Sequence, residues 1–171
     1  MDPIAAILLL TIAAGACIPL GGFIASFEHI RTRWLEQELR HFLIAVGGGI
    51  LLGAVAVVLV PEGVASMQDS MLAIPIMLVG GLVFFVIERA LGLRRREAPQ
   101  VMGMLLDYVP EAIALGGMVA LASPVAPLLA LLIGLQNLPE GFNAFRELNA
   151  LKHRSARRTL LIMGSLVVIG P

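Results

Sequence analysis

The chain has 171 residues, of which 58% are apolar and 14% are charged, whereas soluble proteins average about 45–50% apolar and roughly 25% charged residues. The 12 basic and 12 acidic residues balance, so the basic surplus that releases counterions from a nucleic acid is missing. A single cysteine, Cys17, excludes an intrachain disulfide and a zinc ribbon. The composition indicates a membrane protein with no nucleic-acid partner.

Six apolar segments follow one another along the chain. A bilayer core of about 30 Å needs about 20 apolar residues in a helix. Complete spans are predicted at Ile4–Phe27, Phe42–Gly63, Met71–Ile87, Val101–Leu121 and Pro124–Phe145, and a sixth apolar segment runs from Thr159 to Pro171. The sixth is too short to cross a bilayer, and we interpret the end of the chain as a truncation. The pattern predicts an all-α fold, a multi-pass transmembrane bundle forming one membrane domain over residues 1–171.

Basic residues occur only after the first, third and fifth segments, and the loops at 64–70 and 122–123 contain none. They are Arg31, Arg33, Arg40, Arg89, Arg94, Arg95, Arg96, Arg146, Lys152, Arg154, Arg157 and Arg158. The positive-inside rule assigns these loops to the cytoplasm. We therefore expect a plasma-membrane protein, at the inner membrane in a bacterium, with its N-terminus outside. No basic residue precedes the first segment, which favours a retained helix over a cleaved signal peptide.

Two neighbouring segments keep polar residues inside their apolar spans. Asp107 and Glu111 share a face of the fourth, and Gln136, Asn137 and Glu140 share a face of the fifth. At about 1.5 Å per residue, both sets lie at a similar depth from the cytoplasmic helix ends. Carboxylates at this depth repel one another, and a bound divalent cation is the simplest compensation. We predict that these five residues form a metal site.

A proline precedes each of these glutamates, at Pro110 and Pro139. A proline inside a helix leaves the carbonyl group four residues earlier without its hydrogen bond, here those of Leu106 and Leu135. Such carbonyl groups are tolerated at membrane depth where they line a cavity, and transporters use them to hold ions. The prolines therefore add neutral oxygen ligands to the predicted site.

A third Pro-Glu pair, Pro61-Glu62, ends the second segment at the predicted outer surface. Glu62 is a candidate entrance residue that would concentrate cations, although an ordinary helix end explains the pair equally well. The histidines lie at cytoplasmic loops or their edges and fit solvated roles: His29, His41 and His153. The methionines form no repeated thioether motif and fit packing roles: Met67, Met71, Met77, Met102, Met104 and Met118. Glycine pairs such as Gly49 and Gly53 also fit helix packing.

The Pro-Glu pairs resemble those of the ZIP (Zrt/Irt-like) family of divalent metal transporters. That family carries His-Asn-x-Pro-Glu-Gly on its fourth helix and a related polar motif on its fifth. The matching stretches here are Asp107-Tyr108-Val109-Pro110-Glu111-Ala112 and Gln136-Asn137-Leu138-Pro139-Glu140-Gly141. Ile18-Pro19-Leu20-Gly21-Gly22 and Pro61-Glu62-Gly63 also look like family segments. The resemblance covers the whole chain and is most specific in the fourth and fifth segments.

The resemblance implies an eight-span fold, of which this chain supplies the first five helices and half of the sixth. It implies uptake of a divalent metal as the transported substrate, zinc by family default, with no prosthetic group. Asp107 stands where the family has histidine, and Asn137 where a carboxylate is common. An all-oxygen site favours harder ions such as Mn²⁺, so manganese and iron stay open. The implied partners are the lipid bilayer and the ion, and a homodimer also stays open.

Three other classes of function compete with metal transport. An intramembrane metalloenzyme needs histidine ligands in the manner of His-Glu-x-x-His, and no histidine lies within the third to fifth segments. We therefore expect no enzymatic activity. A proton-coupled carrier of a small organic solute would use Asp107 and Glu111 as titrating groups. A metal-binding homologue that does not transport would keep the same residues without turnover.

Overall fold

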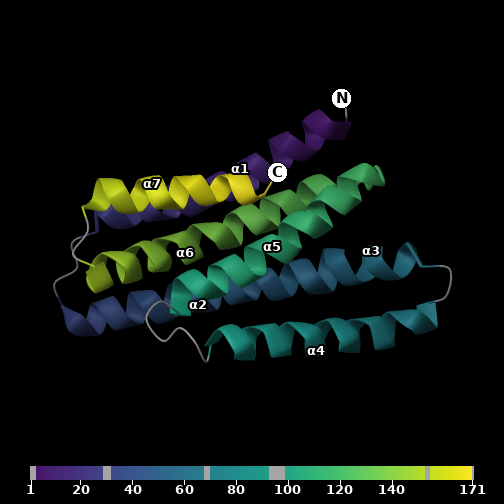
Figure 1. Cartoon of the computed structure of the whole chain (residues 1–171), viewed down its shortest axis with the longest axis horizontal. Helices are drawn as coiled ribbons and strands as arrows, with labels where there is room; N and C mark the ends of the chain where they lie inside the picture. The colour runs from purple at the N-terminus through teal and green to yellow at the C-terminus, as the bar shows by residue number, and fades with distance from the viewer. Residues whose placement is uncertain (1–2, 29–31, 68–69, 93–98, 153–154, 171) are drawn as a thin grey trace.

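The computed structural model describes residues 3–28, 32–67, 70–92, 99–152 and 155–170, and their regular structure is entirely helical. The elements are α1 (Pro3–Ser26), α2 (Arg33–Ala54), η1 (Val55–Leu59), α3 (Val60–Ala65), η2 (Ser70–Leu72), α4 (Ala73–Gly92), α5 (Pro99–Ala120), α6 (Ala126–Lys152), α7 (Ala156–Leu166) and η3 (Val167–Ile169). The predicted all-α class is confirmed. Successive long helices run in opposite directions (Figure 1).

Four helices are long and apolar enough to cross a membrane: Ile4–Ser26, Trp34–Ala65, Ser70–Leu91 and Gln100–Ala120. They correspond to the first four predicted spans. The fifth predicted span begins two residues before α6, which has 27 residues. This helix is not among the four that are apolar enough, because amides and charges interrupt it. The sixth predicted segment forms α7, with 11 residues, and the short η3.

The second membrane-spanning helix is longer than the predicted apolar segment Phe42–Gly63, because α2 begins at Arg33. It continues through a π-helical turn, η1, into α3. In this turn the Val60 amide group donates to the carbonyl group of Val55, five residues earlier. Pro61 follows directly and has no N–H group to donate. The wider turn therefore lies where the regular hydrogen-bond pattern is already interrupted.

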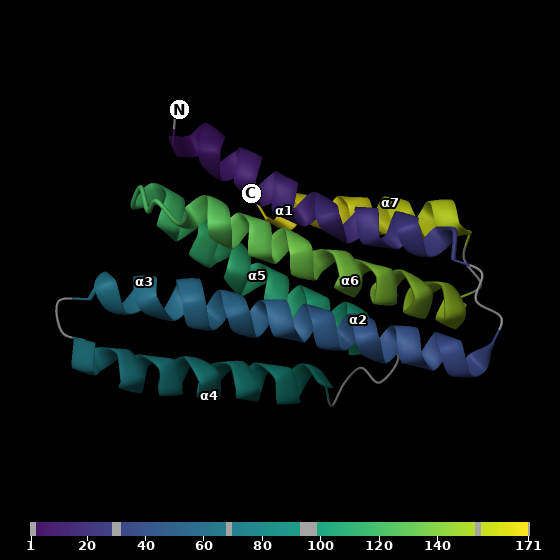
Figure 2. The same ribbon diagram turned by 180° about the vertical axis from the view of Figure 1, so that it is seen from behind.

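Helix α6 lies at the centre of the bundle and packs against α1, α2, α5 and α7 (Figures 1 and 2). Its closest neighbour is α1. A Cβ atom at Gly141 would overlap the carbonyl oxygen of Ile18, and one at Gly21 would overlap that of Leu138. Only glycine allows two helix backbones to approach this closely. These two glycines therefore position α6 against α1.

Helix α4 is set apart from this packing. It lies at the edge of the bundle (Figures 1 and 2), and none of the residues in its apolar window is buried. The buried core is formed by the other helices and includes Ile18, Tyr108, Leu115, Leu129, Ile133 and Met163. The fold thus consists of a packed group around α6 and one apolar helix beside it.

The helix ends next to the predicted cytoplasmic loops gather at one end of the bundle. These are the C-terminal ends of α1, α4 and α6 and the N-terminal ends of α2, α5 and α7 (Figure 1). The arrangement agrees with the alternation of basic loops in the sequence. Arg31, Arg94, Arg95, Arg96, Arg154, His29, His153 and Pro171 lie outside the described residues, and His41 is exposed.

Candidate metal centre

Both predicted polar stripes lie in the central helices. Pro110 is inside α5 and Pro139 is inside α6, and both helices continue past their proline. The prolines leave the carbonyl groups of Leu106 and Leu135 without their usual helical donors. The prediction that these two Pro-Glu pairs lie inside helices is confirmed.

Glu111 and Gln136 join α5 to α6. The Gln136 Nε2 atom donates to Glu111 Oε1 across 2.6 Å, and the two residues are 6% and 0% exposed. The second carboxylate oxygen, Glu111 Oε2, and the amide oxygen, Gln136 Oε1, are buried with no hydrogen-bond partner in the described part of the chain. A buried oxygen without a donor is costly, so this pair can accept a further positive group.

Asp107 and Glu140 line a cavity of about 220 Å³ between α2, α5 and α6. The wall from α2 is apolar and contains two glycines, and the walls from α5 and α6 are mainly polar. The lining residues are Leu43, Ile44, Gly47, Gly48, Leu51, Gln100, Gly103, Met104, Asp107, Glu140 and Asn143. The Oε2 atom of Glu140 is buried and lacks a hydrogen-bond partner among the described residues. The cavity is large enough for a hydrated ion.

Among the described residues, no basic side chain forms an ion pair with the carboxylates of this region. The ion pairs of the described residues both involve Arg146, which contacts Glu28 and Glu36 at the end of the bundle. The negative charges of Asp107, Glu111 and Glu140 can therefore be stabilised only by nearby amides or by a bound cation. Unpaired carboxylates in a low-dielectric interior are strongly unfavourable, which makes a cation a favourable occupant.

Asn137 turns away from the cavity toward α1. Its Nδ2 atom donates to the carbonyl oxygen of Ala14 across 3.0 Å, and its Oδ1 atom has no partner in the described residues. Glu62 lies in α3 and is half-buried, but it is not among the residues that line the cavity. The structure thus brings together Asp107 and Glu140, with the Glu111–Gln136 pair bridging the same two helices.

Three polar or sulfur-containing residues of the cavity were not predicted as site residues: Gln100, Met104 and Asn143. Met104, for which the sequence indicates packing, is 2% exposed and also lines the cavity. Its position three residues before Asp107, and that of Asn143 three residues after Glu140, are the signals that could have identified them. Within the described ranges, no three His, Cys, Asp or Glu side chains lie close enough together to hold a metal ion.

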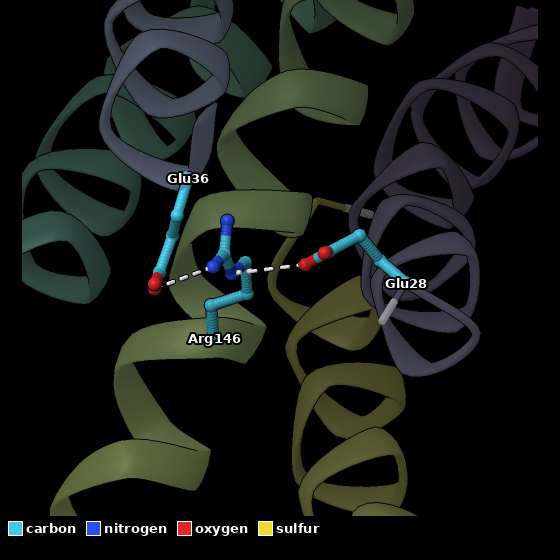
Figure 3. A network of polar contacts seen from close by, with 3 residues as sticks. All are labelled: Glu28, Glu36 and Arg146. Carbon is cyan, nitrogen blue, oxygen red and sulfur yellow. Dashed lines mark hydrogen bonds and ion pairs between the residues drawn. The ribbon is translucent and has the colours of Figure 1, made fainter. Parts of the chain in front are cut away.

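The end of the bundle next to the cavity is held by charged contacts from α6. Arg146 Nη2 donates to Glu36 Oε1 at 2.6 Å, and Arg146 Nε lies 3.4 Å from Glu28 Oε2 (Figure 3). Glu147 Oε2 accepts hydrogen bonds from the backbone amides of Gln100 and Val101 at 3.0 and 3.1 Å. This carboxylate satisfies the N-terminal donors of α5. These contacts tie α1, α2 and α5 to α6.

Comparison of the chain with protein-family models, with curated proteins and with solved structures finds no match.

Proposed function

We propose that this protein transports a divalent metal ion across a membrane, with its binding site in the cavity between α2, α5 and α6. Asp107 and Glu140, which line this cavity, are the proposed first ligands. The buried Glu111–Gln136 pair, which joins the same two helices, supplies the other proposed ligands. Four helices apolar enough to span a bilayer support a membrane location. The motifs around Pro110 and Pro139 support a relationship to the ZIP family. We propose uptake into the cytoplasm, with the N-terminus outside the plasma membrane.

One observation carries this proposal. Glu111 Oε2, Gln136 Oε1 and Glu140 Oε2 are three buried oxygen atoms without donors in the described part of the chain. They belong to helices α5 and α6, whose carboxylates line a cavity. These carboxylates have no basic partner among the described residues. A divalent cation would supply positive charge and coordination to several such oxygens at once, whereas a neutral solute would leave the charge uncompensated.

Zinc is the ion that the family resemblance favours, and manganese or iron suits a site rich in carboxylate and amide oxygens. Intramembrane acids mark ion pathways in many transporters. Alternating exposure of the cavity to the two sides would move the ion. We propose no enzymatic activity and no prosthetic group.

Transport of Zn²⁺ and Mn²⁺ into proteoliposomes tests the proposal. Asp107→Asn and Glu140→Gln keep side-chain size but remove the charge, and each should lower uptake at least tenfold. Glu38→Gln is the matched control, because Glu38 lies on α2 and is exposed; it should transport normally. Normal uptake by both cavity variants would refute the site assignment.

The same vesicles separate the rival functions. A proton-coupled carrier of an organic solute would acidify the vesicle interior with no dependence on metal. A homologue that binds metal without transporting it would retain metal on the purified protein and show no uptake in vesicles. Either result would overturn the transport proposal.

A further inference from the structure

The cavity contains more potential ligands than its two carboxylates. Asp107 lies on α5 with Met104 three residues before it, and Glu140 lies on α6 with Asn143 three residues after it. Residues three apart share a helix face. Because α5 and α6 run in opposite directions (Figure 1), Met104 and Asn143 both lie toward the helix ends joined by Glu147. Each helix therefore offers a carboxylate with a neutral donor three residues away toward those ends, and α5 also contributes Gln100.

Asn143 is suited to this role by its surroundings. It is 5% exposed and lines the cavity. Its oxygen would gain a partner from a cation in the cavity. Gln100 also lines the cavity, and its backbone N–H group donates to Glu147.

Met104 is the one sulfur-containing residue that lines the cavity. The other α2 and α5 residues there that carry no charge or amide are Leu43, Ile44, Leu51 and glycines, and these carry no side-chain donor atom. A divalent transition metal takes at least four ligands. Since only two carboxylates line the cavity, further protein ligands within it would come from residues of other types.

We propose that Met104 and Asn143 complete the metal site with Asp107 and Glu140, and that the Met104 thioether makes the site prefer Zn²⁺ over Mn²⁺. This inference rests on the proposed function, since it assigns ligands to the same cavity. Thioether sulfur is a soft ligand that favours softer ions, whereas carboxylate and amide oxygens favour Mn²⁺, Mg²⁺ and Ca²⁺. The two carboxylates would give the site affinity for divalent ions, and the thioether would bias it toward zinc.

Competition binding on the purified full chain tests the proposal without requiring transport. Mn²⁺ binding is followed by its electron paramagnetic resonance signal, and Zn²⁺ is added to displace it. Met104→Leu preserves an apolar side chain of similar volume. We expect it to lower the preference for Zn²⁺ over Mn²⁺ about tenfold, with Mn²⁺ affinity changed less than about threefold. Met118→Leu is the matched control, because Met118 is buried on α5 outside the cavity, and it should leave the preference unchanged.

Asn143 is tested in the same assay. Asn143→Ala should lower the affinity for both ions about tenfold. Asn143→Asp should restore the affinity because it returns an oxygen ligand. A Zn²⁺ preference that is unchanged in Met104→Leu, while Asp107→Asn and Glu140→Gln abolish binding, would overturn this inference and leave the proposed function standing. A wild-type protein that binds neither ion would overturn both. Equal loss of preference in the Met118→Leu control would also reject a specific role for Met104.

Discussion

Helices α4 and α6 show opposite relationships between composition and position. Helix α4 is the more apolar of the two, yet it lies at the edge of the bundle. Its residues Leu78 and Leu82, for example, are 68% and 64% exposed. Helix α6 is interrupted by Gln136, Asn137 and Glu140, yet it lies at the centre with the two amide residues fully buried. In water this arrangement would be reversed.

The difference follows from the solvent. Lipid is as apolar as leucine, so an apolar helix gains little by packing against protein. A polar side chain in a bilayer needs protein partners, because lipid supplies no donors or acceptors. The more polar helix α6 therefore packs at the centre, whereas an apolar helix such as α4 can lie at the edge with few protein contacts. The variants below test this contrast, beginning with the largest expected effect.

The same substitution should have opposite consequences in the two helices. Gly141→Val on α6 introduces a Cβ atom that overlaps the Ile18 carbonyl oxygen, whereas Gly81→Val on α4 meets nothing within 4 Å. We expect Gly141→Val to destabilise the fold by roughly 3 kcal/mol or more through overpacking, and Gly81→Val to change stability by less than about 0.5 kcal/mol. Thermal unfolding in mild detergent measures both. Equal losses would mean that α4 has a packing partner in that sample.

A charge should be tolerated less well in α4 than in α6. Leu82→Asp exposes a carboxylate to lipid and should disfavour membrane insertion of α4 by about 3 kcal/mol, which is roughly a hundredfold in the insertion equilibrium. Leu82→Ala is the control for lost volume. Insertion is read from glycosylation of sites flanking the helix. If the Asp variant inserts as well as the Ala variant, α4 faces water or protein instead of lipid.

The charged contacts at the end of α6 should contribute less. Arg146→Gln removes ion pairs to Glu28 and Glu36, and we expect a loss of roughly 1 kcal/mol because the groups are only partly buried. The loss should shrink at high salt. Arg157→Gln, at an exposed position on α7, serves as the matched control. An unchanged melting temperature for Arg146→Gln at low salt would show that these pairs do not hold the helix ends together.

Tyr108 provides the smallest expected effect. Its side chain is 1% exposed, and its hydroxyl group is wedged against Gly15 and Gly170 without a hydrogen-bond partner among the described residues. Tyr108→Phe should therefore leave stability unchanged or raise it by up to about 1 kcal/mol. Thermal unfolding again provides the measurement. A clear loss of stability would reveal a partner for the hydroxyl group, such as an ordered water.

Much of the helical layout could be predicted from the sequence, because about 20 consecutive apolar residues have few alternatives to a membrane helix. The helix ends were harder to predict. Helix α6 continues to Lys152, past Phe145, because charges end an apolar run without breaking helical hydrogen bonds. The isolation of α4 was not predicted, since an apolar run carries no information on which neighbours it contacts.

The candidate site was predicted in part. Spacing along each helix identified Asp107, Glu111, Gln136 and Glu140, because i, i+4 residues share a face. The turn of Asn137 toward Ala14 depends on how α1 crosses α6, which no single helix encodes. Met104 was interpreted as packing because the methionines form no repeated thioether motif. Its position on the cavity wall depends on how α2, α5 and α6 pack together.

The π-helical turn η1 changes the phase of the second span. A five-residue turn holds one residue more than an α-helical turn, so every later side chain is rotated by about 100° around the axis. Gly47 and Gly48, which line the cavity, precede this turn, whereas Glu62 follows it in α3. One additional residue thus lets the side chains before and after the turn face different directions around a single continuous helix.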